Sequence, residues 1–565
     1  MDFIGILKLM SAERTDIMAF RTELGETIFK QKYASNPYET WGDKAHNVVN
    51  SVCGTYDGKK NNLMDRSDQD QLAKYVSEFK FIPGGRYLWY AGRDARFYNN
   101  CYLLRLEEDT REEWAGVTQR AMSCLMTGGG IGVDVSVARP SGRQLRRTGG
   151  VASGPIPLLY TLNEVGRNVM QGGSRRSALY GSMNWGHEDA QNLLVAKNWH
   201  DLKAGDTTLA ELKKTDFNFP APLDMMNVSL NYDDAWLHST GRSHNPTFVQ
   251  NVTQAMMTGE PGFSFNFGDK ENETLRNACT EITSEDDSDC CNLGSINLAN
   301  IESIEEFKDV VNLSTKFLVC GLIRAQLPYQ KVVEVRQKNS RIGLGLMGLH
   351  EWLLQRGYKY EMVDELKQWM KVYERESKRS ADEHCDRLFL NRPKGYRAIA
   401  PTGSISILAG TSSGVEPLFA VAYRRRYLAD GTKWKHQFVV DGTAQVLIDS
   451  GINPDKIETA TDLAFDVERR IKMQYELQKY VDHGISSTIN LPQWGTEANN
   501  EDKVKDFARV ISEYAPGLRG LTVYPDGSRG GQPITPVAYE EAVSKRGVIF
   551  EDNSEEQCLS GVCGI

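Results

Sequence analysis

Asparagine, cysteine and glutamate alternate in one short stretch of the chain, at Asn277, Cys279 and Glu281. In an extended segment, side chains two residues apart point the same way, so this spacing predicts that an amide, a sulfur and a carboxylate converge on one bound molecule. Taken alone the pattern is weak, because most cysteines in a large protein are small buried residues and most loop carboxylates are solvated. A thiol pair, Cys290 and Cys291, follows at the start of an apolar segment. The stretch is therefore the first candidate for a reactive site.

More thiols lie at both ends of the chain. Cys101 stands near the start of a strand-like run, residues 96–109, and Cys558 and Cys563 lie in a small, polar terminal segment that has little reason to pack. A mobile dithiol can exchange with a disulfide in a pocket and then be reduced from outside. A zinc pair is the rival interpretation, but it needs two further ligands that nothing nearby supplies, so no metal site is predicted. The single cysteines are expected in the core: Cys53, Cys124, Cys320 and Cys385.

Small hydroxyl residues and glycines cluster in residues 401–417, after a strand-like segment. Backbone N–H groups and hydroxyls in such a turn make an anion cradle with little net charge, suited to the phosphates of a nucleotide. A Ser/Gly-rich linker is the alternative, which the preceding strand disfavours. The predicted cradle comprises Thr402, Gly403, Ser404, Ile405 and Ser406.

The surrounding pattern predicts an α/β fold after a helical lead-in. Residues 111–126 and 158–170 have helical patterns. The glycines at 128–132 follow a helix and open a strand, which is the reverse of a dinucleotide-binding loop, so a Rossmann site is rejected. Residues 200–230 are polar and longer than a connector requires, which indicates a ligand-responsive segment or an exposed insertion.

The composition is that of a globular protein of 565 residues with a formal charge of −9. This charge provides no basic surface for nucleic acid, so no nucleic-acid partner is expected. The sequence has no apolar run that could span a membrane and no secretory leader pattern, and its ten cysteines are too sparse for a disulfide scaffold. We therefore expect a cytoplasmic protein without a membrane partner.

Taken in order, these motifs resemble the catalytic subunit of ribonucleotide reductases. The resemblance runs from about residue 80 to the end and rests on PGGRYLW, NNC, GGGIG, QGGSRR, NxCxE, CNLGSINL, RIGLGLMG, PTGSISILAGTSSGVEP and TVYPDGSR, followed by the terminal cysteines. It implies a ten-stranded α/β barrel of two five-stranded halves, with a central loop that presents a radical cysteine. The expected organisation is a helical region over residues 1–98, the barrel over 99–535 and a flexible tail with a redox dithiol over 536–565.

The resemblance also implies roles for the candidate residues. Cys279 becomes the thiyl radical that takes the 3′ hydrogen of the ribose, Glu281 is the base for the 3′-OH, and Asn277 holds the substrate. Cys101 and a second thiol supply two electrons; Cys291 is expected because it directly precedes NLGSINL, with Cys290 as the alternative. Cys558 and Cys563 re-reduce the resulting disulfide, and residues 402–406 bind the substrate phosphates without help from a lysine. Because a sulfur radical must be kept from water, Cys279 is expected to be buried.

The radical source is predicted from the stretch LTVYPDGSR, where Tyr524 is followed by proline instead of the second tyrosine of a radical relay. This favours the adenosylcobalamin-dependent class. The alternative is a catalytic chain that needs a separate metal-containing radical-generating subunit, and an alternative of another kind is an inactive nucleotide-binding regulatory relative. The resemblance further implies a ribonucleoside di- or triphosphate substrate, Mg with the nucleotides, a deoxynucleoside triphosphate effector near residues 200–230, a thioredoxin- or glutaredoxin-like reductant and a homodimer.

Overall fold

The N-terminal part is mainly helical, as predicted, but it also gives a strand to the main sheet. The structure, a computed structural model, describes residues 20–55, 62–146, 149–169, 177–216, 219–429, 433–528 and 534–551. The lead-in elements are α2 (Glu23–Ile28), the π-helix η1 (Phe29–Tyr33), α3 (Trp41–Cys53), α4 (Arg66–Ser77), β1 (Phe81–Pro83) and α5 (Gly85–Tyr90). Strand β1 pairs with β11 (Asp289–Asn297), so the lead-in region is part of the main fold.

Five parallel strands form the first half of the barrel, in the order β2 (Cys101–Arg105), β3 (Gly130–Asp134), β4 (Leu179–Asn184), β7 (Met226–Tyr232) and β8 (Gly262–Phe265). Parallel neighbours need crossover connections. Helices supply most of these connections: α6 (Arg111–Met126), α7 (Ile156–Asn168), α8 (Ala190–Val195), α9 (Leu209–Thr215), α10 (Asp234–Leu237) and α11 (Pro246–Thr258). The helices predicted at 111–126 and 158–170 correspond to α6 and α7.

The second half is also parallel and runs opposite to the first. Strand β11 pairs with β12 (Ile342–Met347), and single bridges continue the ladder through residues 397–399 to residue 485. The chain then enters β15 (Thr488–Leu491), which pairs with β16 (Gly520–Pro525). Because β11 is antiparallel to β2 and β16 is antiparallel to β8, the two halves close into one ring. The predicted ten-stranded barrel of two five-stranded halves is confirmed.

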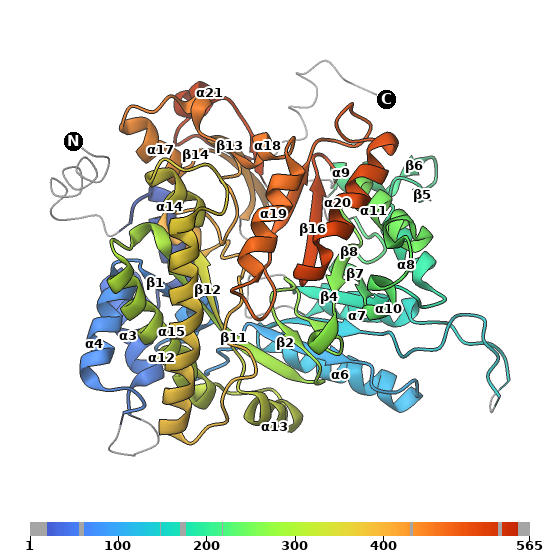
Figure 1. The fold of residues 1–565 in the computed structure, drawn as a ribbon, viewed down its shortest axis with the longest axis horizontal. Helices are drawn as coiled ribbons and strands as arrows, with labels where there is room; N and C mark the ends of the chain where they lie inside the picture. Colours follow the sequence, from blue (N-terminus) through green and yellow to red (C-terminus); the bar gives the residue numbers. More distant parts are fainter. Residues whose placement is uncertain are drawn as a thin grey trace.

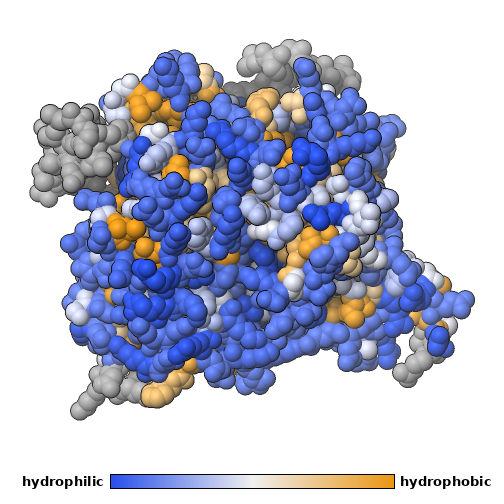
Figure 2. Space-filling view, in the orientation of Figure 1, coloured by the Kyte–Doolittle hydropathy of each residue, from blue (hydrophilic) through white to orange (hydrophobic). Residues whose placement is uncertain are grey.

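Helices cover the outside of the barrel. Those of the second half are α12 (Ile304–Arg324), α13 (Gln330–Asn339), α14 (Leu349–Gln355), α15 (Asp364–Leu388), α16 (Ile405–Ala409), α17 (Gly442–Asp449), α18 (Ala460–Leu463), α19 (Val467–Gln478) and α20 (Val504–Tyr514). Figure 1 shows α12 and α15 side by side with the lead-in helices, whereas α11 and α20 cover the other half. The face in Figure 2 is mostly hydrophilic, with its apolar residues in small groups. None of the helices in the described part of the chain has the length and apolar character needed to span a bilayer.

The end of the described chain is folded, which differs from the flexible tail predicted for residues 536–565. Strands β17 (Ile534–Pro536) and β18 (Ile549–Glu551) flank the hairpin of β13 (Ala422–Ala429) and β14 (Lys433–Val440). Between them, α21 (Tyr539–Ser544) buries Ala542 against Phe438. Backbone pairing and this small core therefore hold the chain as far as residue 551.

A short hairpin lies inside the barrel. Its strands are β9 (Leu275–Arg276) and β10 (Thr283–Ser284). Two of its apolar side chains pack against inward-facing residues of both barrel halves, in a cluster of Leu275, Ile282, Cys101, Leu103, Cys291, Leu293 and Ala398. The hairpin is the central loop that the sequence predicted.

Candidate active site

The tip of the central hairpin carries the predicted trio, but in a turn and not in an extended segment. The Thr280 N–H donates to the Asn277 carbonyl over 3.0 Å, and Thr280 has a left-handed backbone with φ of 68°. The two-residue alternation therefore does not explain why the side chains converge. They converge because a tight turn projects residues 277–281 from the hairpin into one cavity.

The hairpin is fixed where it leaves the strands. A Cβ placed on Gly132 of β3 would lie 1.8 Å from the Arg276 carbonyl oxygen, so only glycine allows this approach. The Arg276 guanidinium is buried and donates to the Asn266 side chain and to the Arg519 carbonyl, which lie on other segments. At the tip, the Gly484 N–H donates to the Glu281 carbonyl over 2.7 Å. These contacts set the position of residues 277–281.

Glu281 and Asn277 both contact the sulfur of Cys101. Asn277 Nδ2 donates to Cys101 Sγ over 3.0 Å, Cys101 Sγ donates to Glu281 Oε1 over 3.7 Å, and Asn277 Oδ1 accepts from the Ile282 N–H. Burial raises the pKa of Glu281 to about 7, although hydrogen bonds from Asn277 and Cys101 oppose the shift. Glu281 Oε2 is buried and has no hydrogen-bond partner among the described residues. A carboxylate with this pKa and a spare oxygen is suited to proton transfer near neutral pH.

The two candidate redox thiols face each other across a strand pair. Cys101 on β2 is in register with Cys291 on β11, whereas Cys290 is in register with Tyr102 and packs with it in a different core cluster. Residues directly opposite on antiparallel strands have Cα atoms about 4.5–5.5 Å apart, which is within the range of disulfides. Burial comes first among the causes that raise the pKa of both Cys101 and Cys291 well above the ordinary value. Both sulfurs are therefore held as protonated thiols.

Cys279 is exposed, so the expectation that its side chain is buried is wrong. The physical reason is that it faces a cavity of about 310 Å³, which is large enough for a small ligand. A molecule bound there would cover the sulfur. The cavity is lined by the hairpin tip, the start of β2 and most of the predicted cradle: Asn277, Cys279, Glu281, Cys101, Thr402, Gly403, Ser404 and Ile405.

The cradle, residues 402–406, lies at the cavity and is held by its own backbone. Thr402 has a left-handed φ of 53°, and its hydroxyl accepts from the Gly414 N–H over 2.7 Å. One contact to the cradle was not predicted: Lys32 Nζ donates to Ser404 Oγ over 2.8 Å. A lysine so far away in sequence gave no local signal.

Similarity to known proteins shows the family of this chain. The family model described as ribonucleotide reductase, barrel domain, matches residues 99–223, 249–375 and 394–524. The chain belongs to the ribonucleotide reductase family. The matched ranges contain strand β2 with Cys101, the central hairpin and the cradle.

Individual reductases are similar over most of the chain. The vitamin B12-dependent ribonucleoside-diphosphate reductase of Mycobacterium tuberculosis (strain CDC 1551 / Oshkosh) is 25% identical over 583 aligned positions, which cover 91% of this chain and 80% of the relative. The protein of the same name from Thermoplasma acidophilum is 24% identical and covers 82% of this chain and 66% of the relative. Among solved structures, the class Id ribonucleotide reductase alpha subunit of Actinobacillus ureae has a TM-score of 0.67 at 17% identity, with 91% of this chain and 98% of that chain covered. At 17% identity, this structural similarity shows a shared fold and nothing further.

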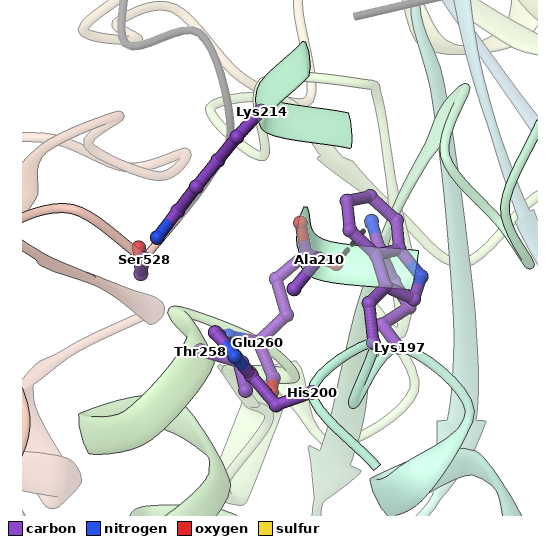
Figure 3. A pocket seen from close by; sticks show the side chains of 8 residues that line it. Lys197, His200, Ala210, Lys214, Thr258, Glu260 and Ser528 are labelled. Atoms are coloured by element: carbon purple, nitrogen blue, oxygen red, sulfur yellow. Dashed lines mark hydrogen bonds and ion pairs between the residues drawn. The ribbon is translucent and has the colours of Figure 1, made fainter. Parts of the chain in front are cut away.

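The segment expected to respond to an effector, residues 200–230, contains short strands β5 (Lys203–Ala204) and β6 (Thr207–Thr208) besides α9. A pocket of about 20 Å³ lies beside it, and in Figure 3 the Lys214 side chain extends toward Ser528, which also lines the pocket. Lys197 pairs with Glu260 over 2.8 Å within this pocket. The volume is enough for about one water molecule, so a nucleotide effector at this segment needs contacts outside this pocket.

Several predicted residues are not among those that line the cavity. Cys558 and Cys563 lie outside the described residues, as do the arginines of QGGSRR. Tyr524 is half-buried on β16. Within the described chain, no group of three or more His, Cys, Asp or Glu side chains is arranged to hold a metal ion. The cysteines assigned to the core are buried, as predicted: Cys53, Cys124, Cys320 and Cys385.

Proposed function

We propose that this chain converts ribonucleoside di- or triphosphates to 2′-deoxyribonucleotides by a thiyl-radical mechanism. The observation that carries the proposal is one cavity lined by Cys279, Glu281 and Cys101, with Cys291 in register with Cys101 on the neighbouring strand. A radical sulfur, a base and a two-electron donor are what replacement of a ribose hydroxyl by hydrogen requires. Membership of the ribonucleotide reductase family agrees with this activity.

The first step is hydrogen abstraction. The Cys279 thiyl radical takes the 3′ hydrogen of the bound ribose, which leaves the radical on the sugar and restores the Cys279 thiol. Glu281 Oε2, which lacks a partner in the described structure, accepts the 3′-OH proton. Asn277 donates to the Cys101 sulfur and so keeps that thiol beside the carboxyl. Covering of the cavity by substrate keeps water from the radical.

The second step is reduction. Cys101 gives a proton to the 2′-OH, which leaves as water, and Cys291 gives a hydrogen atom to C2′. The two sulfurs then pass one further electron to the sugar as they become a disulfide, and Glu281 returns its proton to the 3′ oxygen. The Cys279 thiol then returns its hydrogen to C3′ and becomes the thiyl radical again. The sum is one ribonucleotide and two thiols converted to one deoxyribonucleotide, one disulfide and one water. High thiol pKa values at Cys101 and Cys291 support this role, because the protonated forms are the donors.

Adenosylcobalamin is the radical source that we propose, in line with the names of the B12-dependent relatives. When bound, it supplies the one-electron oxidation that turns a thiol into a thiyl radical. This chain fits that source in one respect: Cys279 is exposed on the turn of residues 277–281, so its sulfur would be the group that the cofactor oxidises. The residue after Tyr524 is proline, which leaves the tyrosine relay of the subunit-dependent class incomplete.

The remaining partners extend the same proposal. Cys558 and Cys563 exchange with the Cys101–Cys291 disulfide and are themselves reduced by a thioredoxin- or glutaredoxin-like protein. Residues 402–406 bind the substrate phosphates, with Mg accompanying the nucleotides. A deoxynucleoside triphosphate effector near residues 200–230 selects the base, and the active form is a homodimer in the cytoplasm.

The test mixes the purified chain with a ribonucleotide, a small dithiol and adenosylcobalamin, and measures deoxyribonucleotide. Product without a second protein is expected, and Cys279→Ser gives none while it still binds ribonucleotide. Product only after addition of a metal-containing subunit would favour the subunit-dependent alternative. Absence of product under both conditions, with nucleotide binding retained, would favour the inactive regulatory relative.

A further inference from the structure

The N-terminal segment is docked directly onto α16, the short helix that follows the phosphate cradle. Gly25 of α2 comes so close that a Cβ placed on it would lie 2.9 Å from the Leu408 carbonyl oxygen. At the far end of α16, Arg21 Nη1 donates to the Gly410 carbonyl over 3.2 Å. Backbone contact in the middle and a hydrogen bond at one end therefore fix this segment relative to the cradle.

At the other end of α16, the π-helix η1 places a cation beside Ser404, a residue that lines the cavity. The Ala34 N–H donates to the Phe29 carbonyl over 2.9 Å, which is the wide turn of a π-helix, a form that is frequent at functional sites. Tyr33, the last residue of η1, lines the cavity, and its neighbour Lys32 contacts Ser404 over 2.8 Å. Lys32 is thus at the cradle end of the cavity, with its side chain half-buried.

The charges of the residues that line the cavity indicate what this lysine can bind. Among the described residues that line the cavity, Glu281 is the one carboxylic acid and none is Lys or Arg. A nucleoside di- or triphosphate brings several negative charges, which main-chain N–H groups and hydroxyls satisfy only in part. We propose that Lys32 is a phosphate-binding residue of the substrate site, supplied by the N-terminal segment. This inference rests on the proposed function and adds a residue that sets how strongly the site prefers phosphorylated substrates.

The contact with Ser404 has a clear physical consequence. An ammonium is a compact charge with three donors, so Lys32 can keep its bond to the Ser404 hydroxyl and donate to a phosphate oxygen as well. Loss of a charge-assisted hydrogen bond weakens binding about tenfold to a hundredfold. That loss falls on phosphorylated ligands and not on the nucleoside, because the nucleoside has no phosphate oxygen to accept from the lysine.

The experiment measures binding of a ribonucleoside, its 5′-diphosphate and its 5′-triphosphate to the full-length chain carrying Lys32→Met, Lys32→Arg or Lys30→Met. Lys30 is a matched control on the same π-helix, because its ammonium pairs with Glu26 over 2.6 Å and its side chain is 63% exposed. Lys32→Met is expected to weaken both phosphorylated ligands about tenfold or more and the nucleoside less than about twofold. Lys32→Arg keeps most of the affinity, and Lys30→Met changes none of the three.

The inference is overturned if Lys32→Met and Lys30→Met have the same affinities for all three ligands. It is also overturned if Lys32→Met loses as much affinity for the nucleoside as for the diphosphate and triphosphate, because that result indicates loosening of the whole segment. Turnover of the unmodified chain is assayed in parallel. If it makes no deoxyribonucleotide but its nucleotide binding still depends on Lys32, the proposed function fails and the phosphate role stands.

Discussion

Ionisation of the buried Glu281 carboxyl lowers the free energy of unfolding, and a substitution that cannot ionise removes this cost. Burial raises its pKa from 4.5 to about 7, so the folded protein holds this proton more tightly than the unfolded chain does. Stability is therefore lost as the pH rises through the window from 4.5 to about 7. At about 1.4 kcal/mol per pKa unit, the cost is about 3 kcal/mol at about pH 8 and about 1 kcal/mol at about pH 5.5. Glu281→Gln cannot ionise, so it is expected to abolish turnover and to stabilise the protein by these amounts.

The assay compares urea unfolding midpoints of the wild type and Glu281→Gln at these two pH values. Glu273→Gln, just before β9, is the control with opposite sign. Burial opposes the ionisation of Glu273, but Arg519 and Arg341 override this and hold its pKa at about 2. Its carboxylate stabilises the fold above pH 4.5, and that stability is lost as the pH falls toward 2, so Glu273→Gln destabilises the protein at both test pH values. The reasoning is refuted if Glu281→Gln is no more stable than the wild type at the higher pH, or if its advantage does not shrink on acidification.

Three further outcomes follow from the same geometry. Cys279→Ser is expected to lose all deoxyribonucleotide formation and keep substrate affinity; residual turnover would show that another residue carries the radical. Cys558→Ser with Cys563→Ser should lose activity with a protein reductant but retain it with a small dithiol, whereas equal loss with both reductants speaks against a shuttle. Gly132→Ala forces a Cβ onto the Arg276 carbonyl and should lower turnover about tenfold or more. In the control Gly42→Ala, the new Cβ has its nearest neighbour 3.8 Å away, so turnover should not change. Equal rates in the two variants would contradict the anchoring of the hairpin.

Much of the fold was predictable from local pattern. The strand at Cys101, the helix over 111–126 and the glycine-to-strand order at 128–132 agree with β2, α6 and β3. The barrel itself came from resemblance, because its closure depends on pairing between distant segments. Single bridges at residues 397–399 complete the ring, and such short pairings have no periodic signal in the sequence.

The candidate site was predicted in composition but not in geometry. The trio at 277–281 was expected in an extended segment, yet a turn with left-handed Thr280 places it. Exposure of Cys279 follows from the cavity, which only the assembled barrel creates. The contribution of Lys32 depends on docking of η1 against the cradle, a contact between residues far apart in sequence. The spacing of motifs in the sequence does not predict tertiary contacts of this kind.

The most direct test of the account is a single turnover without external reductant in the Cys558→Ser, Cys563→Ser variant, followed by mass spectrometry of its peptides. With adenosylcobalamin and a ribonucleotide, we expect one disulfide between Cys101 and Cys291 for each deoxyribonucleotide formed, because these thiols are in register across β2 and β11. Product without this disulfide, or a disulfide that contains Cys290 in its place, would contradict it.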